Sequence, residues 1–235
     1  MKKLRVLLLC AAMLVLVAGC ESTKWIEEAA DKIDEDIASG EFVLEGEEFS
    51  FPMMMEDWLD NEWHVSNNYD NTDVFTLEPG GLCEEFEVFR DDDNKQYVSI
   101  VAWNDGVEDA KIPECAVYSV SMRLDKNDAV FPQGISKRSN EEDIIDAYGE
   151  PAAEYEEDGF LYLVYWLDSE EMGYASVTFK LNQNTRSDEK VAEVLYELLD
   201  FEQTFGILKK SQISVGTVSY GDLEIVGGLS NEAFV

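Results

Sequence analysis

The sequence has little of what nucleic-acid binding and histidine-dependent catalysis require. Among its 235 residues there is one histidine, His64, and only 17 Lys or Arg against 51 Asp or Glu. A protein that holds phosphates needs a basic surface, so the formal net charge of −34 argues against nucleic acid as a partner. If charge selects a partner, that partner is cationic. Otherwise the acidic residues simply keep a surface protein soluble.

Recognisable catalytic and cofactor motifs are also absent. A Ser-His-Asp or Cys-His site would have to use His64, and no G-x-S-x-G motif accompanies it. There is no phosphate-binding loop, no G-x-G-x-x-G and no Cys/His cluster of the zinc type. The acidic run Asp91–Asn94 lacks the spaced oxygen ligands of a calcium loop. We therefore predict no catalytic residue, no metal site and no cofactor.

Residues 1–19 are typical of a signal peptide. A basic start, Met1–Arg5, precedes an apolar run of twelve residues from Val6 to Val17, which is too short for an ordinary membrane span. Val17-Ala18-Gly19-Cys20 resembles the lipobox of bacterial lipoproteins. This resemblance implies cleavage before Cys20, lipidation of its thiol with palmitate-type chains, and anchoring to the extracytoplasmic face of the cell membrane.

Two cysteines, Cys83 and Cys115, remain after Cys10 leaves with the signal peptide and Cys20 is lipidated. Disulfides persist outside the cytoplasm, and a bridge here would close a loop of about 32 residues, worth about 3–4 kcal/mol in the loop-entropy model. Buried free thiols are the alternative. Both alternatives stay open, with the disulfide preferred.

Hydrophobic periodicity predicts a mixed helix and sheet protein. Residues 20–44 are expected to form the lipidated N-terminus and an acidic helical stalk, either exposed or packed loosely on the domain. Helices are predicted over 53–60 and from a Ser139 cap to Gly149, where Pro151 prevents continuation. Strands are predicted where apolar and polar residues alternate, over 73–77, 84–90, 96–103, 115–123, 153–157, 160–167 and 173–181.

The region 187–200 is ambiguous. Val191, Val194, Leu195, Leu198 and Leu199 fit one helix face, which favours a helix. A strand from 191 to 198 at the edge of a sheet is the weaker alternative. The tail 201–235 is Gly-rich and apolar in patches, and its residues 213–220 could add a strand.

An internal repeat supports the fold class. Glu56-Asp57-Trp58-Leu59-Asp60 matches Glu142-Asp143-Ile144-Ile145-Asp146 at an offset of 86 residues, and each segment is followed by several strands. A short helix buries its apolar side by packing on a sheet. We therefore predict an α+β fold with two repeated units, each a short helix plus an antiparallel sheet, over 45–130 and 131–200.

The segment from Gly134-Ile135 to Asn140–Pro151 resembles the "GI…S/T-x-E-D-V-I-x-x-Y-G-x-P" segment of uncharacterised lipoproteins from Gram-positive bacteria. Residues 97–100 and 113–117 are similar to the strand pair that precedes it in those proteins. Their modules resemble the helix-plus-sheet repeats of β-lactamase-inhibitory proteins and of small outer-membrane assembly lipoproteins. The resemblance implies a binding or assembly role in which a sheet face is presented to another protein.

Aromatic residues suggest which face that is. Tyr162 and Trp166 share one face of their strand, whereas Tyr165 points to the opposite face. One set packs against the helix and the other is available to bind a protein or peptide, although each aromatic on its own is typical of a core. The sequence thus predicts a membrane-anchored, non-catalytic binding or assembly module with a protein partner. A cation- or small-solute-binding lipoprotein and a carboxylate-dependent envelope hydrolase are the alternatives.

Overall fold

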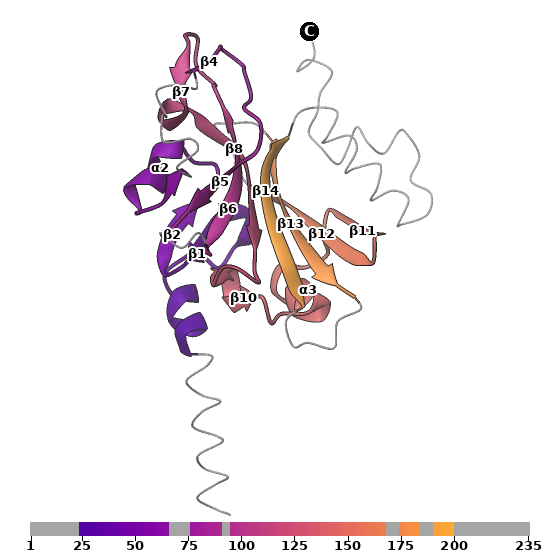
Figure 1. Ribbon diagram of the computed structural model, residues 1–235. Coiled ribbons are helices and arrows are strands. Elements are labelled where there is room, and N and C mark those ends of the chain that lie inside the picture. Colours follow the sequence, from indigo (N-terminus) through magenta and orange to yellow (C-terminus); the bar gives the residue numbers. More distant parts are fainter. Residues whose placement is uncertain (1–23, 66–75, 91–94, 168–173, 184–189, 200–235) are drawn as a thin grey trace, which may run out of the picture.

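The computed structural model describes residues 24–65, 76–90, 95–167, 174–183 and 190–199 (Figure 1). Within these ranges the chain is an α+β protein in which all paired strands run antiparallel. The predicted signal peptide, Cys20, Asp91–Asn94 and the tail 201–235 lie outside the described residues.

An eight-stranded sheet forms the centre of the molecule, in the order β11-β12-β13-β14-β8-β6-β5-β3. The strands β14 and β8 join its two halves, with Tyr196 opposite Val120. The predicted units 45–130 and 131–200 therefore share one sheet and one hydrophobic core. The strand bounds are His64–Val65 (β3), Phe86–Phe89 (β5), Tyr97–Trp103 (β6), Ala116–Arg123 (β8), Ala153–Glu157 (β11), Phe160–Leu167 (β12), Tyr174–Asn182 (β13) and Val191–Leu199 (β14).

A second sheet has four strands in the order β10-β9-β1-β2. Its hairpin turns at Glu45-Gly46, both with positive φ, as tight hairpins require. Sequence reasoning missed this sheet, whose strands are only two to four residues long: Glu41–Leu44 (β1), Glu47–Ser50 (β2), Ala129–Phe131 (β9) and Ile135–Ser136 (β10). A separate pair consists of Thr76–Leu77 (β4) and Ala110–Lys111 (β7).

Aromatic side chains join the two sheets. Phe42 of β1 stacks on Tyr196 of β14 at 5.0 Å between ring centroids, and Phe131 of β9 meets Phe179 of β13 edge-on at 5.5 Å. The helix α2 (Met55–Asp60) adds Trp58, and α3 (Glu141–Tyr148) adds Ile144 to the same core. The described residues also include the 3-10 segments Ile37–Ser39 (η1), Ile112–Glu114 (η3) and Pro132–Gly134 (η4).

The helix α3 begins one residue later than predicted. Asn140, and not Ser139, is its N-cap: the Asn140 side chain accepts from the Asp143 N–H, and the Asp143 carboxylate accepts from the Asn140 N–H at 2.8 Å. This reciprocal pair is a capping box. Ser139 instead accepts a hydrogen bond from the Ser136 N–H. The helix ends at Gly149, as predicted, where φ is +78°.

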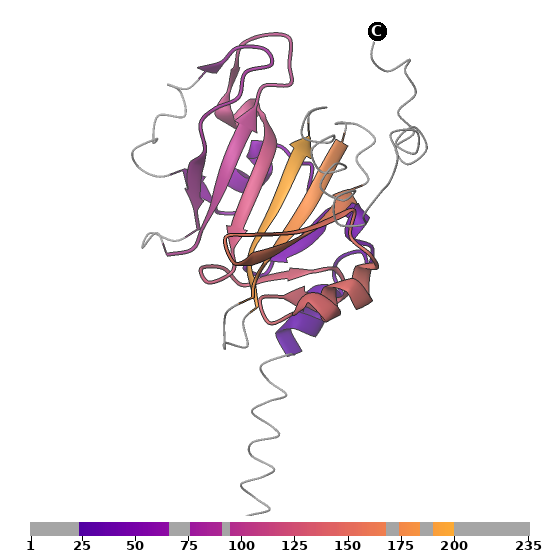
Figure 2. The same ribbon diagram turned by 90° about the vertical axis from the view of Figure 1, so that its right-hand side faces the viewer.

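The expected helical stalk over 20–44 is shorter than predicted. Residues 24–30 are helical, but β1 at Glu41–Leu44 is an interior strand of the four-stranded sheet. Ala29 and Ile33 pack against Val43 and Val130. One apolar residue of the helix and one just after it therefore pack on the four-stranded sheet, so this segment is attached to the domain. Figures 1 and 2 both place residues 24–30, β10 and α3 at one end of the molecule, opposite β4 and β7.

The helix preferred over 187–200 is wrong, because residues 191–199 form the strand β14. Val194, Tyr196 and Leu198 are buried on one face, and the strand pairs with β13 on one side and β8 on the other. Apolar residues at 191, 194, 195, 198 and 199 follow the helical period, whereas the alternating set that the strand buries is 194, 196 and 198. Backbone pairing on both sides then outweighs local helix propensity.

Candidate functional site

The eight-stranded sheet has one face in the core and a second, chemically mixed face. We call the second one the polar face. It is defined by the side chains of alternate residues that are paired across neighbouring strands, namely Tyr155, Phe160, Tyr162, Trp166, Thr178, Lys180, Glu193, Leu195, Glu197, Ser119, Ser121, Arg123 and Ser99.

The predicted division of the β12 aromatics is confirmed. Tyr165 faces the core with only 5% of its surface exposed, meets Tyr148 edge-on and donates to the Gly149 carbonyl at 3.1 Å. Tyr162 and Trp166 lie on the polar face and are half-buried. The structure therefore brings these two predicted binding residues to one face, and their role in binding remains a proposal.

One straight row of side chains crosses five strands of the polar face. Tyr155, Tyr162, Lys180, Glu193 and Arg123 are successive partners in the strand register. The rings of Tyr155 and Tyr162 stack with centroids 4.8 Å apart and planes 4° apart. The Lys180 ammonium lies 4.7 Å from the Phe160 ring centroid and 5.8 Å from that of Tyr162. Such cation–π contacts favour a charged lysine beside aromatic rings.

Lys180 is also held by its charged neighbour. Its Nζ lies 3.0 Å from a Glu193 carboxylate oxygen, and the other oxygen of Glu193 accepts from the Ser121 hydroxyl at 2.5 Å. Partial burial acts to lower the pKa of Lys180, but the hydrogen bond and charge of Glu193 outweigh burial and raise it. Lys180 is consequently cationic at every physiological pH. Sequence reasoning missed this residue because only the β12–β13 register places it beside Tyr162.

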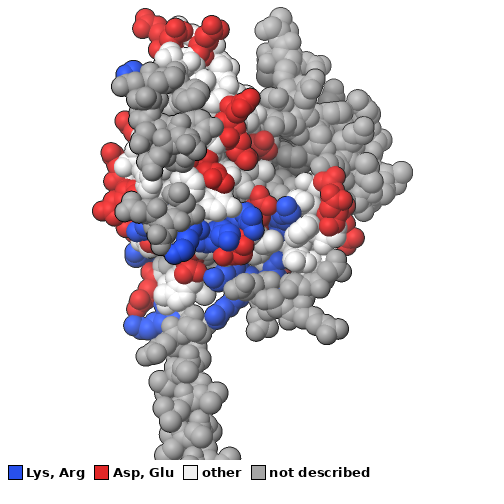
Figure 3. Space-filling model, viewed as in Figure 1, with Lys and Arg blue, Asp and Glu red and all other residues white. Residues whose placement is uncertain are grey.

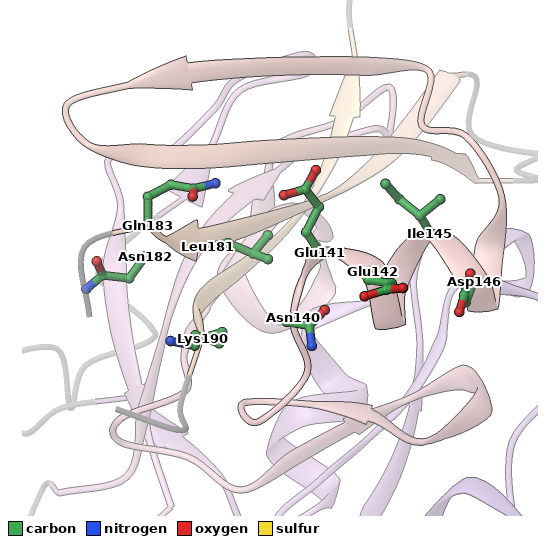
Figure 4. Close-up of a pocket in the computed structure, with 9 residues that line it drawn as sticks. All are labelled: Asn140, Glu141, Glu142, Ile145, Asp146, Leu181, Asn182, Gln183 and Lys190. Carbon is green, nitrogen blue, oxygen red and sulfur yellow. The ribbon is translucent and has the colours of Figure 1, made fainter. Parts of the chain in front are cut away.

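A hollow of about 560 Å³ lies beside α3 (Figure 4). We call it the α3 hollow. Carboxylates of Glu141, Glu142 and Asp146 line it from the helix, and Asn182 at the end of β13, the adjacent Gln183 and one cation, Lys190, line it from the other side. This lining suits a cationic or polyhydroxylated solute. In the described part of the chain, no group of three or more His, Cys, Asp or Glu is arranged to hold a metal ion.

Cys83 and Cys115 are free thiols in the structure. This is the alternative to the disulfide that the sequence favoured. Cys83 hydrogen-bonds to Ala102 of β6 on one side, while Ala116, next to Cys115, pairs with Trp103 on the other side of β6. Two strand spacings amount to roughly 9–10 Å, whereas a disulfide needs Cα atoms within about 7 Å. Burial raises the pKa of Cys115 to about 11 and also raises that of Cys83.

The single histidine lies in the edge strand β3. His64 is half-buried opposite Phe89, with ring centroids 6.3 Å apart. The His64 side chain therefore packs against the ring of Phe89.

Comparison with known proteins identified no matching family model, no matching curated protein and no matching solved structure. Among the described helices, none has the length and apolar character needed to cross a membrane.

Proposed function

We propose that this protein is a lipid-anchored, extracytoplasmic binding or assembly module without catalytic activity, and that it binds a protein through the polar face. The observation that carries the proposal is the aromatic cluster of this face, consisting of Tyr155, Phe160 and Tyr162, with Lys180 against two of its rings. Trp166 lies on the same face, four residues along β12 from Tyr162. Protein interfaces are enriched in Tyr, Trp and Arg, and these residues supply most hot spots.

The shape of the face supports a protein partner. The row from Tyr155 to Arg123 spans five adjacent strands, and strands lie about 4.8 Å apart. The row is therefore roughly 19 Å wide, which suits a protein surface better than a small solute. Hydrogen bonds hold Lys180, Glu193 and Ser121 in place, so little side-chain entropy is lost when a partner binds.

The order of elements supports the proposal that the fold repeats. Helix α2 precedes β3, β5, β6 and β8, and helix α3 precedes β11, β12, β13 and β14. Each set is ordered from an outer edge of the sheet to its centre. Two copies of one helix-plus-sheet unit, joined at β8 and β14, would produce this order. The proposed resemblance to β-lactamase-inhibitory-protein modules rests on this order and on the sequence segment 134–151.

The membrane anchor is proposed from the sequence alone. The lipobox-like Val17–Cys20 lies four residues before the helical residues 24–30. Two acyl chains suffice for stable anchoring. Metabolic labelling with an alkyne fatty acid tests it: labelling that disappears in Cys20→Ser supports the anchor, and label retained in that variant contradicts it.

Co-purification after cross-linking on intact cells tests the binding function. We expect a partner that is enriched with the native chain and lost in the double variant Tyr162→Ala, Trp166→Ala. The matched control is Trp25→Ala, which removes an exposed tryptophan of the N-terminal helix (37% exposed) and should retain the partner. A partner retained by the double variant would contradict a role for the polar face.

A second candidate is solute binding at the α3 hollow, which the carboxylates of Glu141, Glu142 and Asp146 favour. A screen of cationic and sugar ligands by thermal shift tests it. A stabilisation abolished by Glu141→Gln would support this function, and melting temperatures unmoved by all ligands would remove it.

A further inference from the structure

A second hollow, of about 380 Å³, lies where the row of the polar face reaches Arg123. We call it the basic hollow. Its lining comes from β8, β12, β13, β14 and the segment after β10, and includes Arg123, Lys137, Phe160, Lys180, Asn182 and Glu193.

This hollow has a much larger share of cationic side chains than the chain as a whole. Three cationic side chains, Arg123, Lys137 and Lys180, line it together with two carboxylates, Asp125 and Glu193. The complete chain has 17 basic residues against 51 acidic ones. Figure 3 shows that Lys and Arg side chains gather in a band across the lower part of that view, whereas Asp and Glu dominate toward the end with β4 and β7. Three cations gathered in so acidic a protein can bind an anionic group that displaces one of their paired carboxylates.

All three cations are in ion pairs, and an incoming anion can replace the carboxylate in two of them. Arg123 donates to both oxygens of Asp125, at 3.1 and 3.0 Å, but both side chains are about half exposed. Lys137 pairs at 3.0 Å with Asp128, whose side chain is 57% exposed. Exposed pairs contribute little to stability, so a ligand carboxylate can take the place of Asp125 or Asp128. The guanidinium of Arg123 is suited to bidentate binding of that carboxylate.

The apolar lining sets a second requirement. Phe160 is half-buried and borders the same hollow, whereas Leu124 and Val191 at its base are buried in the core. Phe160 is linked through Lys180 to Tyr162 of the aromatic cluster. A ligand that fills the site presents a carboxylate beside an apolar or aromatic group. An acidic peptide segment meets both requirements, and its neighbouring residues then lie over Tyr162.

We propose that the basic hollow binds an Asp or Glu side chain of an acidic, partly apolar segment of the protein that docks on the polar face. This inference rests on the proposed function and names the chemistry of the partner. The net charge alone would predict a cationic partner, whereas this inference predicts an acidic one. The long-range field of the chain repels acidic molecules, but at 0.15 M salt that field is screened beyond about 8 Å, and the contacts in the hollow are shorter.

Fluorescence anisotropy on the full-length protein in detergent micelles at 0.15 M salt tests the proposal. The probe is a labelled, capped peptide with four glutamates between two leucines, and its control has four glutamines. We expect saturable binding of the glutamate peptide, at least tenfold tighter than the control. Arg123→Gln and Lys180→Gln should each weaken it at least fivefold, whereas Lys180→Arg should restore most of the affinity. The matched control Lys111→Gln removes a cation on β7, at the opposite end of the molecule, and should change affinity less than twofold.

Equal affinity for the two peptides, or equal loss in Lys111→Gln and Arg123→Gln, would overturn the proposal. Inorganic phosphate is the competitor: displacement of the peptide by phosphate alone at the same concentration would make the hollow a site for a free anion, which also overturns it. A failure of the proposed function can be told apart from a failure of this inference. If Arg123→Gln loses the peptide but the double variant Tyr162→Ala, Trp166→Ala retains the cross-linked partner, the hollow is an anion site and the polar face is not the docking surface.

Discussion

Tyr196 provides the sharpest test of the core, because its hydroxyl is buried without a hydrogen-bond partner among the described residues. The side chain is completely buried, and its ring stacks on Phe42 and contacts Phe51 at 5.6 Å between centroids. Burial raises the pKa of this phenol far above its usual value, so the hydroxyl stays protonated. Tyr196→Phe retains every ring contact and removes only this buried polar group.

The expected change in stability follows from the burial of that group. Leaving a hydroxyl unpartnered in the core costs about 1–3 kcal/mol, so Tyr196→Phe should raise the free energy of unfolding by about 1 kcal/mol or more. For a domain of this size, 1 kcal/mol corresponds to about 2–4 °C in melting temperature. Urea denaturation and thermal melting of the protein measure the two quantities.

Two neighbouring tyrosines are matched controls, because their hydroxyls are bonded. The Tyr148 hydroxyl donates to the Pro132 carbonyl at 2.6 Å, and the Tyr165 hydroxyl donates to the Gly149 carbonyl at 3.1 Å. Tyr148→Phe and Tyr165→Phe should each lower the free energy of unfolding by about 0.5–1.5 kcal/mol. If Tyr196→Phe destabilises the protein as much as they do, its hydroxyl has a partner and the reasoning is refuted.

Three further predictions concern the thiols, the aromatic core and one glycine. With a pKa of about 11, Cys115 is thiolate in about one molecule per thousand at pH 8, so its alkylation should be slow and rise tenfold per pH unit; fast alkylation at pH 8 would contradict this. Trp58→Ala, which removes a fully buried ring stacked on Phe49 at 4.4 Å, should cost about 3–5 kcal/mol in urea denaturation, and a loss below 1 kcal/mol would show that the core is loosely packed. Gly40→Ala places a Cβ 2.0 Å from the Phe51 carbonyl oxygen at φ +73° and should cost more than the 1–2 kcal/mol of the left-handed conformation alone. The control Gly46→Ala, with φ +88° and nothing within 4 Å, should cost only that conformational part; equal costs would refute the steric argument.

Much of the fold was predictable where local signals agree. The segment from Asn140 to Pro151 combines acids in the first turn, an apolar stripe and a terminal glycine, and it forms α3. The alternation in 160–167 correctly separated Tyr165 from Tyr162 and Trp166. Both successes depend on contacts between residues close in sequence.

The failures share a different cause. The strand β14 was assigned to a helix because most of its apolar residues follow the helical period, and its identity depends on pairing with β8, about 70 residues away. The short strands β1 and β9 have too few residues for a pattern and are stabilised by packing on Tyr196 and Phe179. Lys180 and Arg123 became site residues only through the strand register, which alternation alone does not determine.

The most direct test of the central claim is photo-cross-linking on intact cells. A photoreactive amino acid at position 166 on the polar face is compared with one at position 107, where Val107 is 92% exposed in the loop between β6 and β7. We expect a single protein adduct from position 166 and none from position 107. An adduct from position 107 alone, or equal adducts from both positions, would contradict the proposal that the polar face binds the partner.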